Sequence, residues 1–253
     1  MLEEFFGYNG FAREPEGFLS WQHLTFVMFL TVCMTVLAII FARKNREKDE
    51  RAKNRALIWA AFVMDGIEIV RVVLNCTLGG DPMAWLQALP LYLCSIQFIT
   101  LPLAAFSHGR LKEASMDFVC IFGLIGMLMG TYCAGQNYAC YPVISINNVA
   151  SGITHSAAGF ASLYIMLTGM AGMKRENARI AYGLIIGFSV AAYAVNLGLG
   201  SNYMFLMRGD GTPYDILYNW VCGNRVLYPL GVIALFAIYI EIFYAAFRRL
   251  RRK

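Results

Sequence analysis

Two residues of this sequence have side chains suited to covalent catalysis, and each lies inside a long apolar run. Cys94 ends the segment LPLYLC, and His155 ends the segment SGITH. A thiolate forms poorly in apolar surroundings, and an adjacent histidine base is the usual way to activate the thiol. The pair therefore predicts a nucleophilic Cys94 with His155 as its general base. The alternative is that Cys94 packs as a small apolar residue and His155 is a structural group.

A stripe of polar residues interrupts the second apolar run. Asp65, Glu68, Arg71 and Asn75 follow one another at intervals of three or four residues, so they share one face of a helix. A charged side chain inside a membrane span costs about 2.5–3.5 kcal/mol. The stripe is either a Glu68–Arg71 pair that fixes helix packing or the wall of a polar cavity. In the cavity interpretation, Arg71 grips a lipid phosphate, and Glu68 orients His155 or holds Arg71.

The segment around Cys94 has two further features. Pro90 lacks a backbone N–H, so it is expected to kink the helix and to free the carbonyl group near Leu86. Gln97 follows Cys94 by three residues and should lie on the same face. With a helical rise of about 1.5 Å per residue, Cys94, His155 and Arg71 lie roughly 14, 10 and 12 Å below one boundary of an apolar layer. The spacing thus predicts a thiol, an imidazole and a cation at one level.

The composition indicates the element type that must position these residues. Of the 253 residues, 58% are hydrophobic and 15% charged, and the mean hydropathy is +0.55. These values exclude an ordinary cytosolic globule and a disordered or collagen-like chain. They predict an all-α polytopic membrane protein that forms a single seven-helix domain over residues 1–253. The expected spans are approximately 22–42, 56–78, 86–106, 118–134, 150–173, 180–199 and 226–247.

The positions of the basic residues predict the topology. The connection 43–55 holds seven Lys/Arg residues and the tail 248–253 holds five, and alternate connections together hold 17 of the 21. By the positive-inside rule, the N-terminus is extracytoplasmic and the C-terminus cytoplasmic. The basic tail fits a bacterial plasma membrane. The net charge of +5 does not indicate a nucleic-acid partner, because no Lys/Arg cluster has interleaved aromatic residues.

The cysteines provide no metal-binding pattern. The seven cysteines include no CxxC motif and no Cys/His spacing suited to zinc, so neither a metal nor another cofactor is predicted. Cys76, Cys133, Cys140 and Cys222 lie at or near the outer ends of the expected spans. A disulfide among these four is left open.

Four short segments resemble a known family. They are WQHL at 21–24, LPLYLC at 89–94, the stretch 141–155 that leads to the histidine, and GSNYMFL at 200–206. Their order and spacing over about 20–247 resemble the YwaF-like integral membrane proteins, which are similar to a eukaryotic glycerophospholipid acyltransferase. The resemblance implies that Cys94 and His155 are the catalytic pair. It also implies a supporting role for Asn202 and Tyr203, which match an Asn-Tyr element of the family.

The functional prediction combines the pair with the resemblance. We expect a membrane lipid acyltransferase or ester hydrolase in which an acyl-cysteine forms on Cys94 and passes its chain from a phospholipid to a lysophospholipid or to water. Gln97, Asn196 and Asn202 are the candidate oxyanion donors. One alternative is a non-catalytic heptahelical protein that binds or transports a lipid or small anion through the Glu68/Arg71 cavity. The other is a scaffold whose polar cluster is purely structural.

Overall fold

The structure is a computed structural model that describes residues 2–7, 11–80 and 82–251. The described residues form helices and connecting turns, with no strand among them. The helices are α1 (Leu2–Phe6), α2 (Trp21–Asn45), α3 (Glu50–Thr77), η1 (Ala84–Gln87), α4 (Gln97–Phe106), α5 (Gly109–Tyr132), α6 (Gly135–Cys140), α7 (Ile146–Thr168), α8 (Arg175–Leu199), η2 (Tyr203–Phe205), α9 (Tyr214–Trp220) and α10 (Leu227–Arg251). The all-α prediction is confirmed for this part of the chain.

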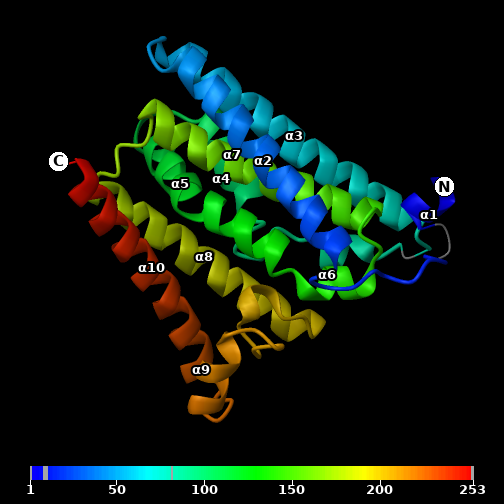
Figure 1. Ribbon diagram of the computed structural model, residues 1–253. Coiled ribbons are helices and arrows are strands. Elements are labelled where there is room, and N and C mark those ends of the chain that lie inside the picture. The colour runs from blue at the N-terminus through cyan, green and yellow to red at the C-terminus, as the bar shows by residue number, and fades with distance from the viewer. Residues whose placement is uncertain (1, 8–10, 81, 252–253) are drawn as a thin grey trace.

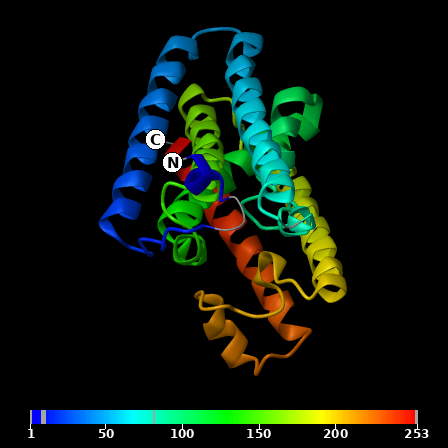
Figure 2. The ribbon, with the colours of Figure 1, turned by 90° about the vertical axis from the view of Figure 1, so that its right-hand side faces the viewer.

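Helix α7 lies at the centre of the bundle. It packs against α2, α3 and α5, while the short helix α4 fits between α3 and α5. Helix α8 packs on α5, and α10 packs on α8 at the side of the molecule (Figure 1). In the view turned by 90°, α9 and the segments next to it lie beyond the bundle at the end of α10 (Figure 2). The helix that carries His155 is therefore enclosed by other helices.

Four of the described helical segments are long and apolar enough to cross a membrane: Trp21–Asn45, Gly109–Cys140, Arg175–Leu199 and Leu227–Phe247. Each coincides with a run that the sequence predicts as a span. Helices α3 and α7 have 28 and 23 residues, which is also long enough, but they carry the polar stripes of the site. The polar side chains lower the mean hydropathy of α3 and α7. The polar faces of the two helices meet inside the bundle.

The third expected span, 86–106, is not a continuous helix. Only η1 and α4 are helical there, and the residues around Pro90 and Cys94 form turns. Two physical causes act together: Pro90 cannot donate a helical hydrogen bond, and Ser95 offers the backbone a local alternative. The Ser95 hydroxyl accepts from the Tyr92 N–H at 3.0 Å and lies 3.2 Å from the Tyr92 carbonyl oxygen. Cys94 thus lies in a turn, and its depth cannot be calculated from helical rise.

Small residues let α7 approach its neighbours closely. A Cβ atom on Gly123 of α5 would lie 2.6 Å from the Ala158 carbonyl oxygen of α7. One on Gly159 would lie 2.4 Å from the Met34 sulfur of α2. The Ser162 hydroxyl of α7 donates to the Cys120 carbonyl oxygen of α5 at 2.8 Å. This backbone-level packing fixes the position of α7, and with it that of His155.

A buried carboxylate in the N-terminal half of α5, that of Asp117, joins three other segments. Asp117 is fully buried and accepts hydrogen bonds from the Met173 N–H at 3.1 Å, the Asn177 amide at 2.9 Å and the Tyr244 hydroxyl at 3.1 Å. These donors come from the α7–α8 connection, α8 and α10. Because a buried charge is tolerated only when it is well paired, this cluster holds the C-terminal helices to the bundle.

Candidate active site

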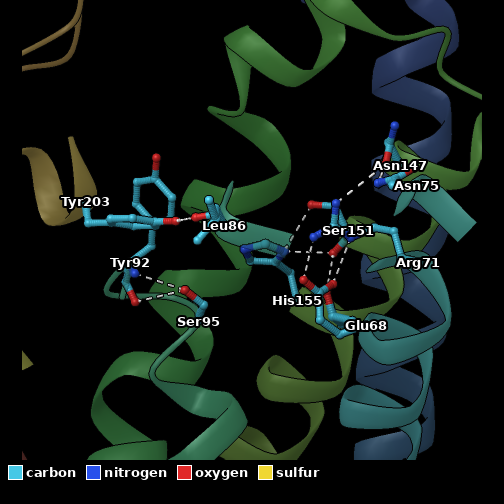
Figure 3. Close-up of polar contacts among 11 residues, drawn as sticks. Glu68, Arg71, Asn75, Leu86, Tyr92, Ser95, Asn147, Ser151, His155 and Tyr203 are labelled. Carbon is cyan, nitrogen blue, oxygen red and sulfur yellow. Dashed lines mark hydrogen bonds and ion pairs between the residues drawn. The ribbon is translucent and has the colours of Figure 1, made fainter. Parts of the chain in front are cut away.

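The orientation of His155 is set by its own helix. Its Nδ1 atom lies 2.7 Å from the Ser151 carbonyl oxygen, one turn earlier on α7. A carbonyl oxygen only accepts, so Nδ1 carries the proton and Nε2 keeps a free lone pair. Figure 3 shows the ring with one nitrogen toward Ser151 and the other directed to the side where Tyr92 and Ser95 lie. This tautomer presents a proton acceptor on the side of Cys94.

Cys94 is placed to give its proton to that nitrogen. The thiol and the His155 imidazole interact at the wall of one cavity, and because Nδ1 is occupied by Ser151, Nε2 is the nitrogen left to face the thiol. The thiol also interacts with the backbone N–H of Ser95, in the turn immediately before α4. Backbone N–H groups at a helix N-terminus favour negative charge. The turn that Pro90 imposes therefore places the thiol beside the Ser95 N–H and at the wall of the same cavity.

The pair borders a small cavity. Its volume is about 30 Å³, which is room for one or two water molecules. Helices α3, α5 and α7 and the segment that leads into α4 all contribute to its wall. The lining residues are Met64, Cys94, Ser95, Gln97, Phe98, Gly126, Thr154, His155 and Ala158. The cavity is large enough for a reacting carbonyl group and too small for a whole lipid.

Gln97 offers a free donor at this cavity. Its side chain is 1% exposed, and its Oε1 atom accepts from the Thr100 hydroxyl at 3.1 Å. Its Nε2 atom is buried and has no hydrogen-bond partner. Buried donors are rarely left unpaired, and exceptions often mark functional sites. Of the three candidate oxyanion donors, Gln97 is the one that lines the cavity of Cys94 and His155.

Two glycines of α5 complete the site, and the sequence analysis does not single them out. A Cβ atom on Gly130 would lie 2.1 Å from both Cδ2 and Nε2 of His155. One on Gly126 would lie 3.7 Å from the Cys94 Cβ atom, which is an ordinary contact. Their separation by one helical turn inside an apolar run is the available sequence signal, and it is weak because it also marks helix packing. Gly130 provides the space for the Nε2 edge of the imidazole.

The α3 stripe faces the site from the other side. Arg71 binds Glu68 through two hydrogen bonds, with Nε–Oε2 and Nη2–Oε1 distances of 2.9 and 2.5 Å. The Asn147 side chain on α7 accepts from Arg71 at 3.5 Å and from Asn75 at 2.8 Å. Of the two roles expected for Glu68, these hydrogen bonds agree with the one in which it holds Arg71. The stripe joins α3 to α7 one turn from Ser151, whose carbonyl fixes His155 (Figure 3).

Asn196 and Tyr203 organise the loop that follows α8. The Asn196 side chain accepts from the Tyr203 N–H at 2.7 Å and from the Ser201 hydroxyl at 2.9 Å, and it donates to the Tyr203 carbonyl at 3.0 Å. The Tyr203 hydroxyl donates to the Leu86 carbonyl oxygen. This is the carbonyl region that Pro90 was expected to free from helical bonding. The loop thereby supports the segment that leads to Cys94.

Asn202 closes the same loop. Its side-chain oxygen accepts from the Met207 N–H at 2.9 Å, and its amide donates to the Arg208 carbonyl and to Asp210, both at 2.8 Å. The amides of Asn196 and Asn202 are thus occupied by loop contacts. Asn196 and Asn202 therefore hold the loop in place, whereas Gln97 lines the cavity.

One protein-family model matches the part of the chain that contains nearly all of these elements. The model of the TMEM164 family matches residues 18–245. The chain belongs to the TMEM164 family. This is a family of membrane proteins, in agreement with the candidate spans, and the matched region includes every residue of the candidate site. No curated protein and no solved structure matches the chain.

The cysteine and metal-binding chemistry of this TMEM164 family member is simple. All seven cysteines are described and none is in a disulfide, including the four near the expected outer ends. Within residues 2–7, 11–80 and 82–251, no group of three or more His, Cys, Asp or Glu side chains is placed to hold a metal ion. The polar side chains that line the cavity are the thiol of Cys94, the imidazole of His155, the amide of Gln97 and the hydroxyls of Ser95 and Thr154.

Proposed function

We propose that this chain is a lipid acyltransferase or lipid ester hydrolase that uses Cys94 as its nucleophile and His155 as its base. The observation that carries the proposal is the Ser151–His155–Cys94 arrangement. A carbonyl group fixes the tautomer of the base, and the free nitrogen of the base faces a thiol at the wall of a small cavity. A nucleophile, a base and a group that orients the base are the essential parts of such a site.

The reaction begins with transfer of the Cys94 proton to Nε2 of His155. The thiolate attacks the ester carbonyl of a phospholipid, and the C–S bond forms as the ester C–O bond breaks. The leaving lysolipid oxygen takes the proton from His155. The acyl-cysteine is then attacked by a lysophospholipid hydroxyl, or by water, whose proton passes to His155 while the C–S bond breaks. The Nε2 amide of Gln97 donates to the oxyanion in both steps.

The membrane arrangement is proposed from the long helical segments and from the basic connections between them. We propose that all seven long segments cross the bilayer as one domain, with α4 and the turns before it as an interrupted third crossing. The excess of basic residues in alternate connections supports an N-terminus outside and a C-terminus in the cytoplasm of a bacterial plasma membrane. Cys94 then lies in the outer half of the bilayer, because it adjoins His155, the tenth residue of the 23-residue α7.

The resemblance to YwaF-like proteins supports this assignment independently of the geometry. The segment LPLYLC and the histidine two spans later match the pair that the resemblance implies. That these two positions, 61 residues apart, line the same cavity supports the proposal. Two lines of reasoning thus lead to the same residues.

Lipid mass spectrometry on the purified protein tests the proposal. The full chain in phospholipid nanodiscs receives a deuterated lysophospholipid, and new diacyl species are counted. Wild type and Cys33→Ala are expected to form product, because Cys33 lies on α2 and does not line the cavity. Cys94→Ala and His155→Ala are expected to form none. Equal turnover in all four proteins would refute the catalytic pair.

The alternative is binding or transport of a lipid or small anion through the Glu68/Arg71 region. The contacts of Arg71 weigh against it, because Glu68 already accepts hydrogen bonds from two of its nitrogen atoms, Nε and Nη2. Uptake of a labelled anion into liposomes distinguishes the two functions. Uptake that Arg71→Ala abolishes and Cys94→Ala leaves unchanged would favour transport over acyl transfer.

A further inference from the structure

An apolar groove follows the outer face of α4. It is a shallow depression open to the surroundings, measures about 500 Å³ and is lined by Phe98, Ile99, Pro102, Leu103, Phe106 and Ser107. The opposite face of α4 is buried against the bundle through Gln97, Thr100, Leu101, Ala104 and Ala105. The groove is therefore the side of this short helix that the protein itself leaves uncovered.

The groove and the cavity of Cys94 have one lining residue in common. Phe98 lines both spaces, so the two adjoin at its side chain. From Phe98 to Ser107 the helix rises about 14 Å. The one hydroxyl in the lining, on Ser107, donates to the Leu103 carbonyl at 2.5 Å and is thereby satisfied within the helix. The surface that the groove presents to an occupant is consequently apolar along its length.

The difference in size between the two spaces indicates how a lipid would be divided between them. A cavity of about 30 Å³ admits an ester carbonyl and excludes a hydrocarbon chain. The chain attached to that carbonyl needs an apolar path that starts at Phe98. Helix α4 begins three residues after Cys94 and leads away from it, so its outer face offers such a path.

We propose that this groove holds the acyl chain that is transferred, with its carbonyl carbon at the Cys94 sulfur and its tail beside Phe106. Phe98 lies at the point where the chain passes from the cavity, which holds the reacting carbonyl, to the groove. The ring of Phe62 on α3 lies 6.0 Å from that of Phe106, at the far end of the path. This inference rests on the proposed acyl transfer and adds to it the part of the protein that selects the chain.

The test measures which chain is loaded on Cys94. The full-length protein in nanodiscs receives equal amounts of dioctanoyl and dioleoyl phosphatidylcholine, and mass spectrometry gives the ratio of the two acyl-Cys94 species. Leu103→Trp narrows the groove at its middle. It is expected to lower the long-to-short ratio about tenfold, the effect of removing roughly two methylenes from apolar contact. Leu103→Ala widens the same point and is expected to raise the ratio.

The matched control is Leu235→Trp on α10, a leucine that is 46% exposed and outside the groove. It is expected to keep the wild-type ratio. If Leu103→Trp and Leu103→Ala also keep that ratio while Cys94 is acylated, the groove is an ordinary lipid-facing surface, and acyl transfer stands without it. If wild type forms no acyl-Cys94 from either lipid, both proposals fail. If Leu103→Trp instead separates an oligomer in light scattering, the face is an interface between copies and the inference is overturned.

Discussion

Replacement of Gly130 by alanine is expected to disable the site without unfolding the protein. The new Cβ atom would lie 2.1 Å from Nε2 and Cδ2 of His155, whereas real Cβ contacts are essentially never below 3.0 Å. The imidazole must therefore move by at least about 0.9 Å. A displacement of about 1 Å in a catalytic group lowers rates by about a hundredfold. We expect a loss of that size in the acylation rate of Cys94.

The effect of this substitution on stability is expected to be small. Overpacking costs about 1–3 kcal/mol, and the gain from alanine over glycine in a helix interior returns about 1 kcal/mol. Thermal unfolding followed by circular dichroism checks that the variant is folded, and single-turnover acylation measures the chemistry.

Gly126→Ala is the matched control for Gly130→Ala, because it adds the same methyl group one turn away. Its Cβ atom would lie 3.7 Å from the Cys94 Cβ atom, so no displacement is required. We expect an acylation rate close to that of wild type. A folded Gly130→Ala protein with the wild-type rate would refute the argument that Gly130 positions the base, as would equal losses in both variants.

Three further substitutions test other parts of the structure. Gln97→Leu removes the unpaired donor and is expected to lower kcat about a hundredfold with little change in KM, which steady-state lipid turnover measures; a change in KM alone would contradict the oxyanion role. Tyr203→Phe leaves the Leu86 carbonyl without its donor and is expected to cost about 1 kcal/mol in chemical unfolding, whereas an unchanged midpoint would contradict the loop contact. Asp117→Ala leaves three buried donors without their acceptor and is expected to cost about 3 kcal/mol; a loss below the error of the assay would show that other groups hold α10.

The sequence predicts most of the helical architecture because apolar periodicity and length are local properties. The segments that become α2, α5, α8 and α10 are long apolar runs, and each is a helix of sufficient length. The third run is different. It is mostly apolar, but Pro90 and the hydroxyl of Ser95 compete with helical hydrogen bonds and leave a ten-residue α4. Hydropathy does not detect this competition, so the predicted span is longer than the helix.

The candidate site is predicted in its chemistry and less well in its geometry. Cys94 and His155 stand out because reactive side chains are rare in apolar runs, and the structure brings them together. Gly130 contributes an absence of side chain, which has no chemical signature in a single sequence. The role of Asn196 also cannot be predicted from its residue type, because an asparagine in an apolar run can hold a loop by hydrogen bonds or donate to an oxyanion. Only tertiary contacts separate those roles.

The central claim is that the Cys94 sulfur becomes acylated with the assistance of His155. Peptide mapping by mass spectrometry, after incubation of the full chain with a phospholipid that carries deuterated chains, tests it most directly. The account predicts a labelled thioester on the peptide that contains Cys94, released by neutral hydroxylamine and reduced at least a hundredfold in His155→Ala. A protein that converts the lipid while the label is missing from Cys94, or is found on another cysteine, would contradict it.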